Sequence, residues 1–192
     1  MNILVGCEES QKVTNAFRKL GHNAISCDIV PTRGNPDHHI QMDVVDAIDL
    51  KNWDMILLFP DCTKMSLSGN RWYGRGKEKH QERIDSIAWT IGLWNKAIKN
   101  CDKVALENPL SVIWRYLPNV NYIQPHQFGH GETKKTGFCL KGLPPLNPTN
   151  NVDGREQRIW KMPPGPNRKR DRSEFYQGVC DAMADQWGGV VL

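Results

Sequence analysis

The sequence of 192 residues predicts an α/β fold built on a doubly wound, mostly parallel sheet. Three observations support this prediction. Short apolar runs of strand length alternate with helical patterns through much of the chain. Acidic or thiol side chains follow several of these runs, and strand ends are where such sheets carry binding sites. Hydrophobic residues make up 39% of the chain, which suffices for one core, so residues 1–192 are expected to form a single domain.

The chain begins with a buried strand predicted over residues 2–6. Apolar residues spaced i, i+3, i+4 and i+7 predict a helix over residues 13–20, and Gly21 suits its end because glycine readily adopts the left-handed conformation. The apolar run 24–29 predicts a second strand with an acid near its end. After a loop rich in turn residues, residues 40–44 are expected to form a short third strand.

The middle of the chain contains the strongest strand, at residues 54–59, which follows a short helix predicted over 45–50. A basic loop containing glycine is expected over residues 70–80. Apolar side chains then line one face of a long helix over 80–99. A fifth strand over 103–106 leads into Glu-Asn-Pro, and the alternation of strand and helix up to this point indicates the parallel sheet.

The remainder of the chain is less regular. A short helical turn is expected over residues 113–117, and two further strands over 122–127 and 136–140. Residues 142–172 are rich in proline and basic side chains and show little periodicity, so they are predicted to be irregular. A closing helix is predicted over 173–187.

Polar side chains follow the predicted strands at the points where the strands end. Right-handed crossovers place the carboxyl ends of parallel strands along one edge of the sheet, and ligands of such folds bind there. The residues expected on this edge are Gly6, Cys7, Glu8, Asp28, Asp43, Pro60, Asp61, Cys62, Glu107 and Asn108. We therefore expect a binding site at this edge.

Cys62 and Glu107 follow successive strands, and neighbouring strands lie about 4.8 Å apart, so both side chains are expected to face one bound molecule. A thiolate beside a carboxyl group suits covalent attack on an electron-poor ring, to which the acid supplies a proton or a hydrogen bond. The alternatives are that Cys62 is a small apolar filler and that Glu107 caps a turn. Asp28 and Asp43 suit hydrogen bonds to a ribose and an adenine amine, unless Asp28 only closes a loop.

The composition limits the partners and the compartment. The formal net charge of +4 permits an anionic partner. Basic residues concentrate in segments 70–80 and 167–172, and the alternative interpretation of both segments is a solvated surface loop. The N-terminus lacks the basic region of a signal peptide, and no apolar run has membrane-spanning length, so we expect a cytoplasmic protein without a membrane partner. The six cysteines form no Cys-x-x-Cys pair, so reduced thiols and no metal are expected.

Four segments occur in the order found in one enzyme family. They are LLFPDCTKMSLSG (57–69), ALENP (105–109), QFGHGETKKTGF (127–138) and RKRDRSEFYQGV (168–179). Together they resemble the C5-cytosine-specific DNA methyltransferases, and the chain looks most like compact members encoded by phages or prophages. The resemblance implies a Rossmann-like methyltransferase fold and the cofactor S-adenosylmethionine. It also implies transfer of a methyl group to carbon 5 of cytosine in DNA, inside a bacterial host cell.

The resemblance implies roles for three sets of residues. The implied catalytic residues are Cys62, Glu107, Asn108, Lys134 and Lys135. The implied cofactor-binding residues are Gly6, Cys7, Glu8, Glu9, Asp28, Ile29, Asp43 and Pro60. The implied substrate-binding residues are Ser66, Arg71, Arg75, Lys77, Arg168 and Arg170.

The family mechanism makes Cys62 the nucleophile. The target cytosine is flipped out of its duplex, because its reactive edge is otherwise buried in the stack. The Cys62 thiolate attacks ring carbon 6, while Glu107 holds or protonates ring nitrogen 3. Asp28 would hold the ribose of the cofactor, and Asp43 its adenine.

The sequence departs from the family pattern at the motifs themselves. The glycine-rich first motif is replaced by VGCEESQ (5–11), in which Glu8 and Glu9 would meet the ammonium group of the cofactor. Asp61 stands where the family has proline, and a carboxylate there tends to raise the pKa of the Cys62 thiol. Two lysines replace the arginines of the third segment, and lysine cannot make the same bidentate contact.

A separate target-recognition domain is not expected. Fewer than 60 residues follow Phe138, and the basic segment 142–172 stands in the place of such a domain. Sequence selectivity would then depend on a partner that confers it. Two alternative functions stay open. One is an enzyme of the same fold that modifies a free pyrimidine nucleotide. The other is a non-catalytic binder of DNA or nucleotide, which Asp61 and the missing glycines suggest.

Overall fold

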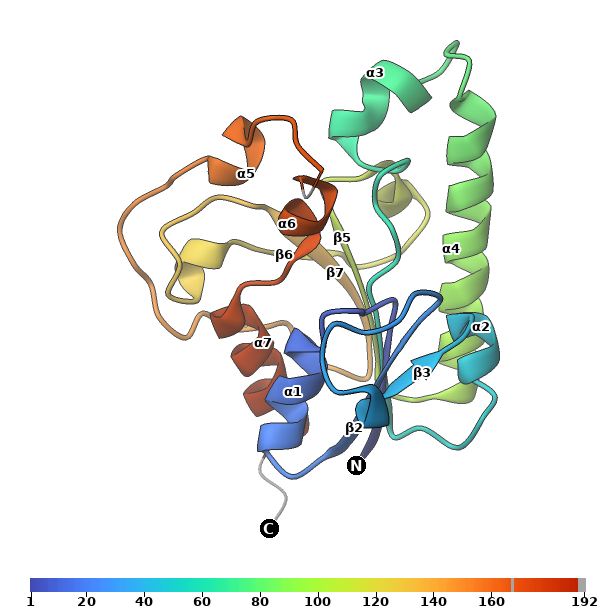
Figure 1. Ribbon diagram of the computed structural model, residues 1–192, viewed down its shortest axis with the longest axis vertical. Coiled ribbons are helices and arrows are strands. Elements are labelled where there is room, and N and C mark those ends of the chain that lie inside the picture. The colour runs from blue at the N-terminus through green and yellow to red at the C-terminus, as the bar shows by residue number, and fades with distance from the viewer. Residues whose placement is uncertain (167, 190–192) are drawn as a thin grey trace.

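The computed structural model describes residues 1–166 and 168–189, and its centre is a seven-stranded sheet (Figure 1). The strands are β1 (Asn2–Gly6), β2 (Asn23–Asp28), β3 (His39–Gln41), β4 (Met55–Leu58), β5 (Val104–Pro109), β6 (Asn121–Ile123) and β7 (Thr136–Lys141). Their order across the sheet is β3-β2-β1-β4-β5-β7-β6. The first five strands are parallel to one another, whereas β7 is antiparallel to both of its neighbours.

Helices cover both faces of this sheet. They are α1 (Lys12–Lys19), α2 (Val44–Ala47), α3 (Asn70–Tyr73), α4 (His80–Asn100), α5 (Arg158–Lys161), α6 (Arg168–Ser173) and α7 (Gln177–Met183), which continues as a π-helical turn over Ala184–Gly188. Figure 1 shows α1 and α7 against one face and α2 and α4 against the other. The short helices α3, α5 and α6 lie beyond the carboxyl ends of the parallel strands (Figure 1).

Two apolar cores lie on opposite faces of the sheet. Because side chains alternate along a strand, Ile3 and Val5 of β1 join the core with α1 and α7, whereas Leu4 joins the core with α2 and α4. The side chains of β4 divide in the same way. Strands buried on both faces have unbroken apolar sequences, which is why the sequence predicted β1 and β4 so closely.

The predicted fold class is confirmed, and two strands end three and four residues earlier than predicted. β3 ends at Gln41, because the Asp43 carboxylate accepts a hydrogen bond from the backbone N–H of Val45 at 2.9 Å and so begins α2. β6 ends at Ile123, because Pro125 begins a 3₁₀ turn. In both cases a local capping or turn residue ends the strand within an apolar stretch.

The C-terminal helix starts later than predicted. Ahead of α7, Phe175 packs edge-on against Phe59, with ring centroids 4.8 Å apart. The Lys134 ammonium group donates a hydrogen bond to the carbonyl oxygen of Glu174 at 3.2 Å. These contacts with residues distant in sequence keep the segment before α7 out of the helix.

Short helices also lie in two segments that were predicted to be irregular. The basic segment 70–80 contains α3, and the segment 142–172 contains α5 and most of α6. Within the described ranges, no helix has both the length and the apolar character needed to cross a membrane.

Candidate active site

Cys62 lies in a tight turn after β4. Its carbonyl oxygen accepts hydrogen bonds from the backbone N–H groups of Met65 at 3.1 Å and Ser66 at 2.8 Å. The Asp61 carboxylate accepts two more, from the backbone N–H and the hydroxyl of Thr63, at 2.9 and 2.5 Å. Such Asx-type bonds stabilise a turn locally. They fix the backbone on both sides of the half-buried thiol.

A buried guanidinium group on α4 holds the segment that follows Cys62. Arg83 is only 5% exposed. It donates hydrogen bonds to the carbonyl oxygens of Lys64 at 2.6 Å and Ser66 at 3.2 Å, and to the side-chain oxygen of Asn70 at 2.7 Å. The helix α4 therefore positions both the turn that carries the thiol and the start of α3. In the sequence, Arg83 has no feature that distinguishes it from the exposed polar residues of the same helix.

Glu107 occupies a buried position on β5, opposite Phe138 of β7. Its carboxylate accepts no hydrogen bond from the residues that the structure describes. Burial raises the pKa of Glu107 to about 7, although Lys134 acts in the opposite direction. A carboxyl group with this pKa is partly protonated at neutral pH, so it can donate a proton as well as accept one.

Asn108 joins the ends of two strands. Its Nδ2 donates a hydrogen bond to the carbonyl oxygen of Pro60 at 3.3 Å, and its Oδ1 is buried without a partner among the described residues. The bond holds the end of β5, which carries Glu107, against the segment that leads from β4 to Cys62. This contact is structural. The catalytic role of Asn108 and the cofactor-binding role of Pro60 stay predictions.

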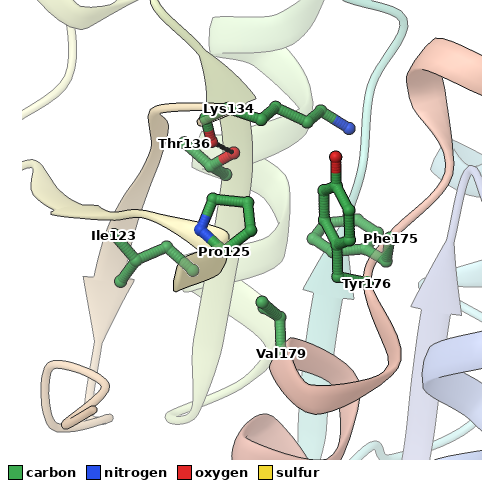
Figure 2. A pocket seen from close by; sticks show the side chains of 7 residues that line it. All are labelled: Ile123, Pro125, Lys134, Thr136, Phe175, Tyr176 and Val179. Atoms are coloured by element: carbon green, nitrogen blue, oxygen red, sulfur yellow. Dashed lines mark hydrogen bonds between the residues drawn. The ribbon is translucent and has the colours of Figure 1, made fainter. Parts of the chain in front are cut away.

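Lys134 reaches the same region from the segment before β7. Figure 2 shows it extending over a small cavity, with Phe175 and Tyr176 on the opposite wall. Its ammonium group lies 5.8 Å from the centroid of the Phe175 ring. Burial lowers the pKa of Lys134, while Glu107 and Cys62 raise it.

Electrostatic coupling connects Cys62, Glu107 and Lys134. Burial, with smaller contributions from Glu107 and Asp61, raises the pKa of the Cys62 thiol to about 11, although Lys134 lowers it. The thiol is therefore protonated at neutral pH when the site holds no substrate. Lys134 is the neighbouring cation that favours the thiolate, and a thiolate is the nucleophilic form.

Arg172 of α6 is a further member of this group that the sequence analysis did not single out. It is half-buried, and its charge is coupled to Cys62 and to Lys134. Burial lowers the pKa of Arg172, and the nearby Arg168 lowers it further. The basic run in the sequence was the available signal, but it did not show which arginine turns toward the thiol.

The predicted substrate-binding arginines and lysine lie on two short elements. Arg71, Arg75 and Lys77 are exposed in and after α3. Arg168 and Arg170 lie on α6, where the first donates a hydrogen bond to a backbone carbonyl at 2.8 Å and the second pairs with the adjacent aspartate at 3.2 Å. Both elements lie beyond the carboxyl ends of the strands (Figure 1).

Two other predicted site residues have partners of their own. The Ser66 hydroxyl lies 3.0 Å from that of Ser68, and Ser66 is 7% exposed. Lys135 is exposed, and its ammonium group lies 4.5 Å from the ring centroid of Tyr122. The substrate-binding role of Ser66 and the catalytic role of Lys135 stay predictions.

Negative charge gathers around Cys7 at the ends of β1, β2 and β4. Cys7 has a left-handed backbone with φ of 61°, a conformation that favours glycine. Burial raises the pKa of its thiol, and the carboxylates of Asp28, Asp43 and Asp61 raise it further. These acids suit a ligand with positive charge, which the sulfonium and ammonium groups of S-adenosylmethionine provide. Ile29, which is 72% exposed beside Asp28, offers an apolar surface suited to an adenine ring.

The loop between β1 and α1 is shaped by Gly6 and Glu8. A Cβ atom at Gly6 would lie 2.3 Å from the side chain of Val44, so only glycine fits there. The Glu8 carboxylate, which is 5% exposed, accepts hydrogen bonds from the N–H of Val13 at 2.7 Å and from the N–H and hydroxyl of Thr14 at 3.1 and 2.6 Å. These bonds stabilise the N-terminus of α1. A contact with the ammonium group of a ligand would break them, and that role of Glu8 stays a prediction.

Glu9 belongs to a network that closes the loop after β2 over the start of α1. Its carboxylate pairs with Arg33 at 3.2 Å, and Arg33 also pairs with Glu174 at 2.9 Å. The fully buried Gln11 donates a hydrogen bond to the carbonyl of Asn35 at 2.8 Å and accepts one from its N–H at 2.7 Å. The predicted contact between Glu9 and the cofactor stays a prediction.

Comparison with known proteins places the chain by its fold. No protein-family model and no curated protein matches the sequence. The methyltransferase EhMeth of Entamoeba histolytica matches with a TM-score of 0.52 and 11% identity, over 87% of this chain and 61% of that chain. A prophage-encoded protein of E. coli, described as a putative DNA modification methyltransferase, matches with a TM-score of 0.51 and 9% identity, over 85% of this chain and 55% of that chain.

These matches define the class of fold. The seven-stranded sheet, in which β7 runs antiparallel to both β5 and β6, has the Rossmann-like methyltransferase fold. The fold that the resemblance implied is therefore confirmed. The chain spans 61% and 55% of the length of the two solved structures.

Proposed function

We propose that this chain transfers a methyl group from S-adenosylmethionine to carbon 5 of cytosine in DNA through a covalent bond to Cys62. The observation that carries the proposal is the electrostatic coupling of Cys62, Glu107 and Lys134, which come from the ends of β4 and β5 and the segment before β7. The methyltransferase fold supports the class of reaction. The similar prophage protein is named a DNA modification methyltransferase, which supports DNA as the substrate.

The chemistry begins at ring carbon 6, because carbon 5 of cytosine is a poor nucleophile until carbon 6 has been attacked. Cys62 gives up its proton to solvent, and its sulfur forms a bond to carbon 6. Protonated Glu107 donates its proton to nitrogen 3, so the ring electrons form a C4–C5 double bond and carbon 5 becomes nucleophilic. Once carbon 5 carries the methyl group, nitrogen 3 returns its proton to Glu107, and loss of the carbon 5 proton to solvent lets the C6–sulfur bond break, with the electron pair leaving on Cys62.

Lys134 assists both of the other groups through its charge. It lowers the pKa of the Cys62 thiol and so raises the fraction of thiolate. It also opposes the rise in the pKa of Glu107 and so keeps that pKa near neutrality, where proton donation and reprotonation are both possible.

The cofactor would lie at the ends of β1 and β2. When bound, S-adenosylmethionine supplies the electrophilic methyl group. Asp28 and Asp43 would hold its ribose and adenine, Ile29 would pack on the adenine, and the acids around Cys7 would favour its positive charge. The residues proposed to contact DNA phosphates are Arg71, Arg75, Lys77, Arg168 and Arg170.

The proposal is tested by transfer of a labelled methyl group. S-adenosylmethionine labelled in the methyl group is offered with duplex DNA, single-stranded DNA and deoxycytidine monophosphate in parallel. We expect label in DNA, recovered as 5-methylcytosine, and none with Cys62→Ala that keeps the wild-type melting temperature. Undiminished transfer by that variant would contradict the covalent mechanism.

Two other functions have specific support. Two observations favour a non-catalytic binder of DNA or nucleotide. The Glu8 carboxylate is already hydrogen-bonded to the N-terminus of α1, and the pKa of the Cys62 thiol is about 11. Absence of label in every substrate, together with no cofactor binding by calorimetry, would identify that case. An enzyme that acts on a free pyrimidine nucleotide would label the mononucleotide and leave DNA unlabelled.

A further inference from the structure

Two tryptophans are exposed to an unusual degree. Trp160 is 75% exposed and Trp72 is 59% exposed, whereas Trp53, Trp94 and Trp187 are each 5% exposed. A large aromatic side chain left in water forgoes a substantial hydrophobic free energy. Exposed aromatic residues of this kind therefore point to a surface that contacts another molecule.

Both tryptophans lie at the end of the molecule that carries Cys62. Trp72 belongs to α3 and Trp160 to α5, and Figure 1 shows both helices beyond the carboxyl ends of the strands. The turn that carries Cys62 runs directly into α3 through the residues held by Arg83. Both aromatic rings thus stand on short helices at the end of the sheet that carries the proposed site.

Each tryptophan stands on an anchored turn of chain, so neither exposure reflects a frayed end. The first residue of α3, Asn70, receives a hydrogen bond from the buried Arg83 at 2.7 Å. In α5, Ile159 is buried at 8% exposure, and Arg158 pairs with Glu132 at 2.9 Å. The indole rings are therefore presented to solvent by fixed backbone.

Positive charge accompanies both rings. The guanidinium carbon of Arg71 lies 5.2 Å from the Trp72 ring, and Arg75 and Lys77 follow it on the same exposed segment. Lys161 is exposed next to the second tryptophan. None of these four cations has an ion pair among the residues that the structure describes. Aromatic rings can stack on the bases of a polynucleotide, and the cations beside them can contact its phosphates.

The arrangement favours a single strand over a duplex. The faces of paired bases are covered by stacking inside a duplex, whereas an unpaired base can stack on an indole ring. The major groove admits a long helix or a two-stranded ribbon, and α3 and α5 each have only 4 residues. Short helices that present one ring each suit stacking better than they suit groove reading.

We propose that Trp72 and Trp160 are stacking platforms for unpaired bases of a single-stranded polynucleotide, on either side of the base held at Cys62. The proposal rests on the proposed function for what happens at Cys62, but the binding surface itself rests on exposure, anchoring and charge. Bases on each side of the target stack on the two rings, and their phosphates contact Arg75, Lys77 and Lys161.

The test is the affinity of the full chain for a fluorescently labelled single-stranded oligodeoxynucleotide of about 20 nucleotides and for the matching duplex. We expect tighter binding of the single strand. Trp72→Ala and Trp160→Ala should each weaken it about fivefold or more, as loss of one stacking contact does. The matched control is Trp89→Ala, since Trp89 is 41% exposed on α4, and it should leave the affinity unchanged.

Substitution by another ring separates stacking from general apolar contact. Trp72→Phe and Trp160→Phe should keep most of the affinity, whereas Trp72→Leu and Trp160→Leu should lose it. Equal or tighter binding of the duplex would overturn the proposal. So would losses at Trp72 and Trp160 no greater than the loss at Trp89.

Failure of this inference and failure of the proposed function give different results. Tight, tryptophan-dependent binding of the single strand without any methyl transfer would retain the platforms and remove the methyltransferase reaction. Methyl transfer to duplex DNA that is insensitive to Trp72→Ala and Trp160→Ala would retain the reaction and remove the platforms.

Discussion

The thiol of Cys62 lies in surroundings that disfavour its reactive form. Burial raises its pKa to about 11, and the neighbouring acids Glu107 and Asp61 add to the effect. Lys134 is the cation that opposes them. The charges of Lys134 and Arg172 both interact with this thiol, so its activation in the proposed mechanism relies on neighbouring cations.

Lys134→Met is expected to slow alkylation of Cys62. The substitution removes the charge that lowers the pKa of the thiol, and each unit of rise in that pKa reduces the thiolate about tenfold near neutral pH. The measurement is the rate at which the peptide containing Cys62 takes up iodoacetamide, followed by mass spectrometry. The adjacent Lys135→Met is the control, because Lys135 lies by Tyr122, and equal slowing by both variants would refute this role of Lys134.

Glu107 makes the folded state less stable as the pH rises. Its pKa of about 7 in the folded chain exceeds the ordinary value of 4.5, so the folded chain holds the proton more tightly. The free energy of unfolding therefore falls between about pH 4.5 and pH 7 and stays lower above that range. Glu107→Gln should be more stable than the wild type at about pH 8, by at most about 3 kcal/mol, with no such gain below about pH 4.

Urea unfolding at the two pH values measures this difference. Glu78→Gln, at an exposed position in the segment before α4, is the matched control and should change stability little at either pH. A gain for Glu107→Gln that is the same at both pH values would show that the carboxyl group titrates normally in the folded chain.

At the scale of elements, α4 positions the turn that carries Cys62 through one side chain, Arg83. Arg83→Ala would leave two backbone carbonyls and the Asn70 side chain without their buried donor. We expect a loss of about 2–4 kcal/mol in the free energy of unfolding, since bonds to charged groups contribute about 1.5–3 kcal/mol each and are not additive. Urea unfolding measures it, with Lys99→Ala at an exposed position of α4 as control.

Methyl transfer should fall with the same substitution, because the turn that carries Cys62 loses its support. Arg83→Lys can restore one of the three hydrogen bonds and should recover part of both stability and rate. Wild-type stability of Arg83→Ala would mean that the backbone after Cys62 holds its own shape.

The sequence predicted the parallel strands well because burial on both faces leaves unbroken apolar runs. It predicted less well where a distant contact decides the local structure. The segment before α7 has a helical pattern, yet Phe59 and Lys134 hold it extended, and neither contact leaves a trace in neighbouring sequence. The short helices α3 and α5 lack the periodicity by which longer helices are recognised.

The same distinction applies to single residues. Cys62 and Glu107 were predictable because strand ends place them, whereas nothing in the Lys-Lys pair distinguished Lys134 from its neighbour. Arg83 has the pattern of a solvent-exposed residue on an amphipathic helix, and only the packing of α4 on the turn shows that it is buried. The sequence indicated no partner for Glu8, but its carboxylate accepts hydrogen bonds from backbone N–H groups at the N-terminus of α1.

For the whole molecule, charge is divided between two regions at one end of the sheet. Acids gather around Cys7, and free cations gather in and after α3. If the cations contact phosphates, the affinity for DNA falls with salt as counterions are released. Replacing both Arg75 and Lys77 by alanine should lower the slope of log affinity against log salt by about 2.

Fluorescence anisotropy at a series of salt concentrations gives that slope. The matched control replaces two exposed lysines, Lys99 and Lys103, at the opposite end of the sheet, and should leave the slope unchanged. Equal effects of the two double substitutions would indicate that only net charge matters.

The proposed bond between Cys62 and the base is tested with DNA that contains 5-fluorocytosine. Fluorine replaces the proton that must leave carbon 5, so the C6–sulfur bond cannot break once the methyl group has been transferred. We expect the full chain, with S-adenosylmethionine, to form a complex that survives denaturation and whose modified peptide contains Cys62. Cys62→Ala should form none. Methyl transfer to normal DNA without any trapped complex, or a complex at another cysteine, would contradict the mechanism.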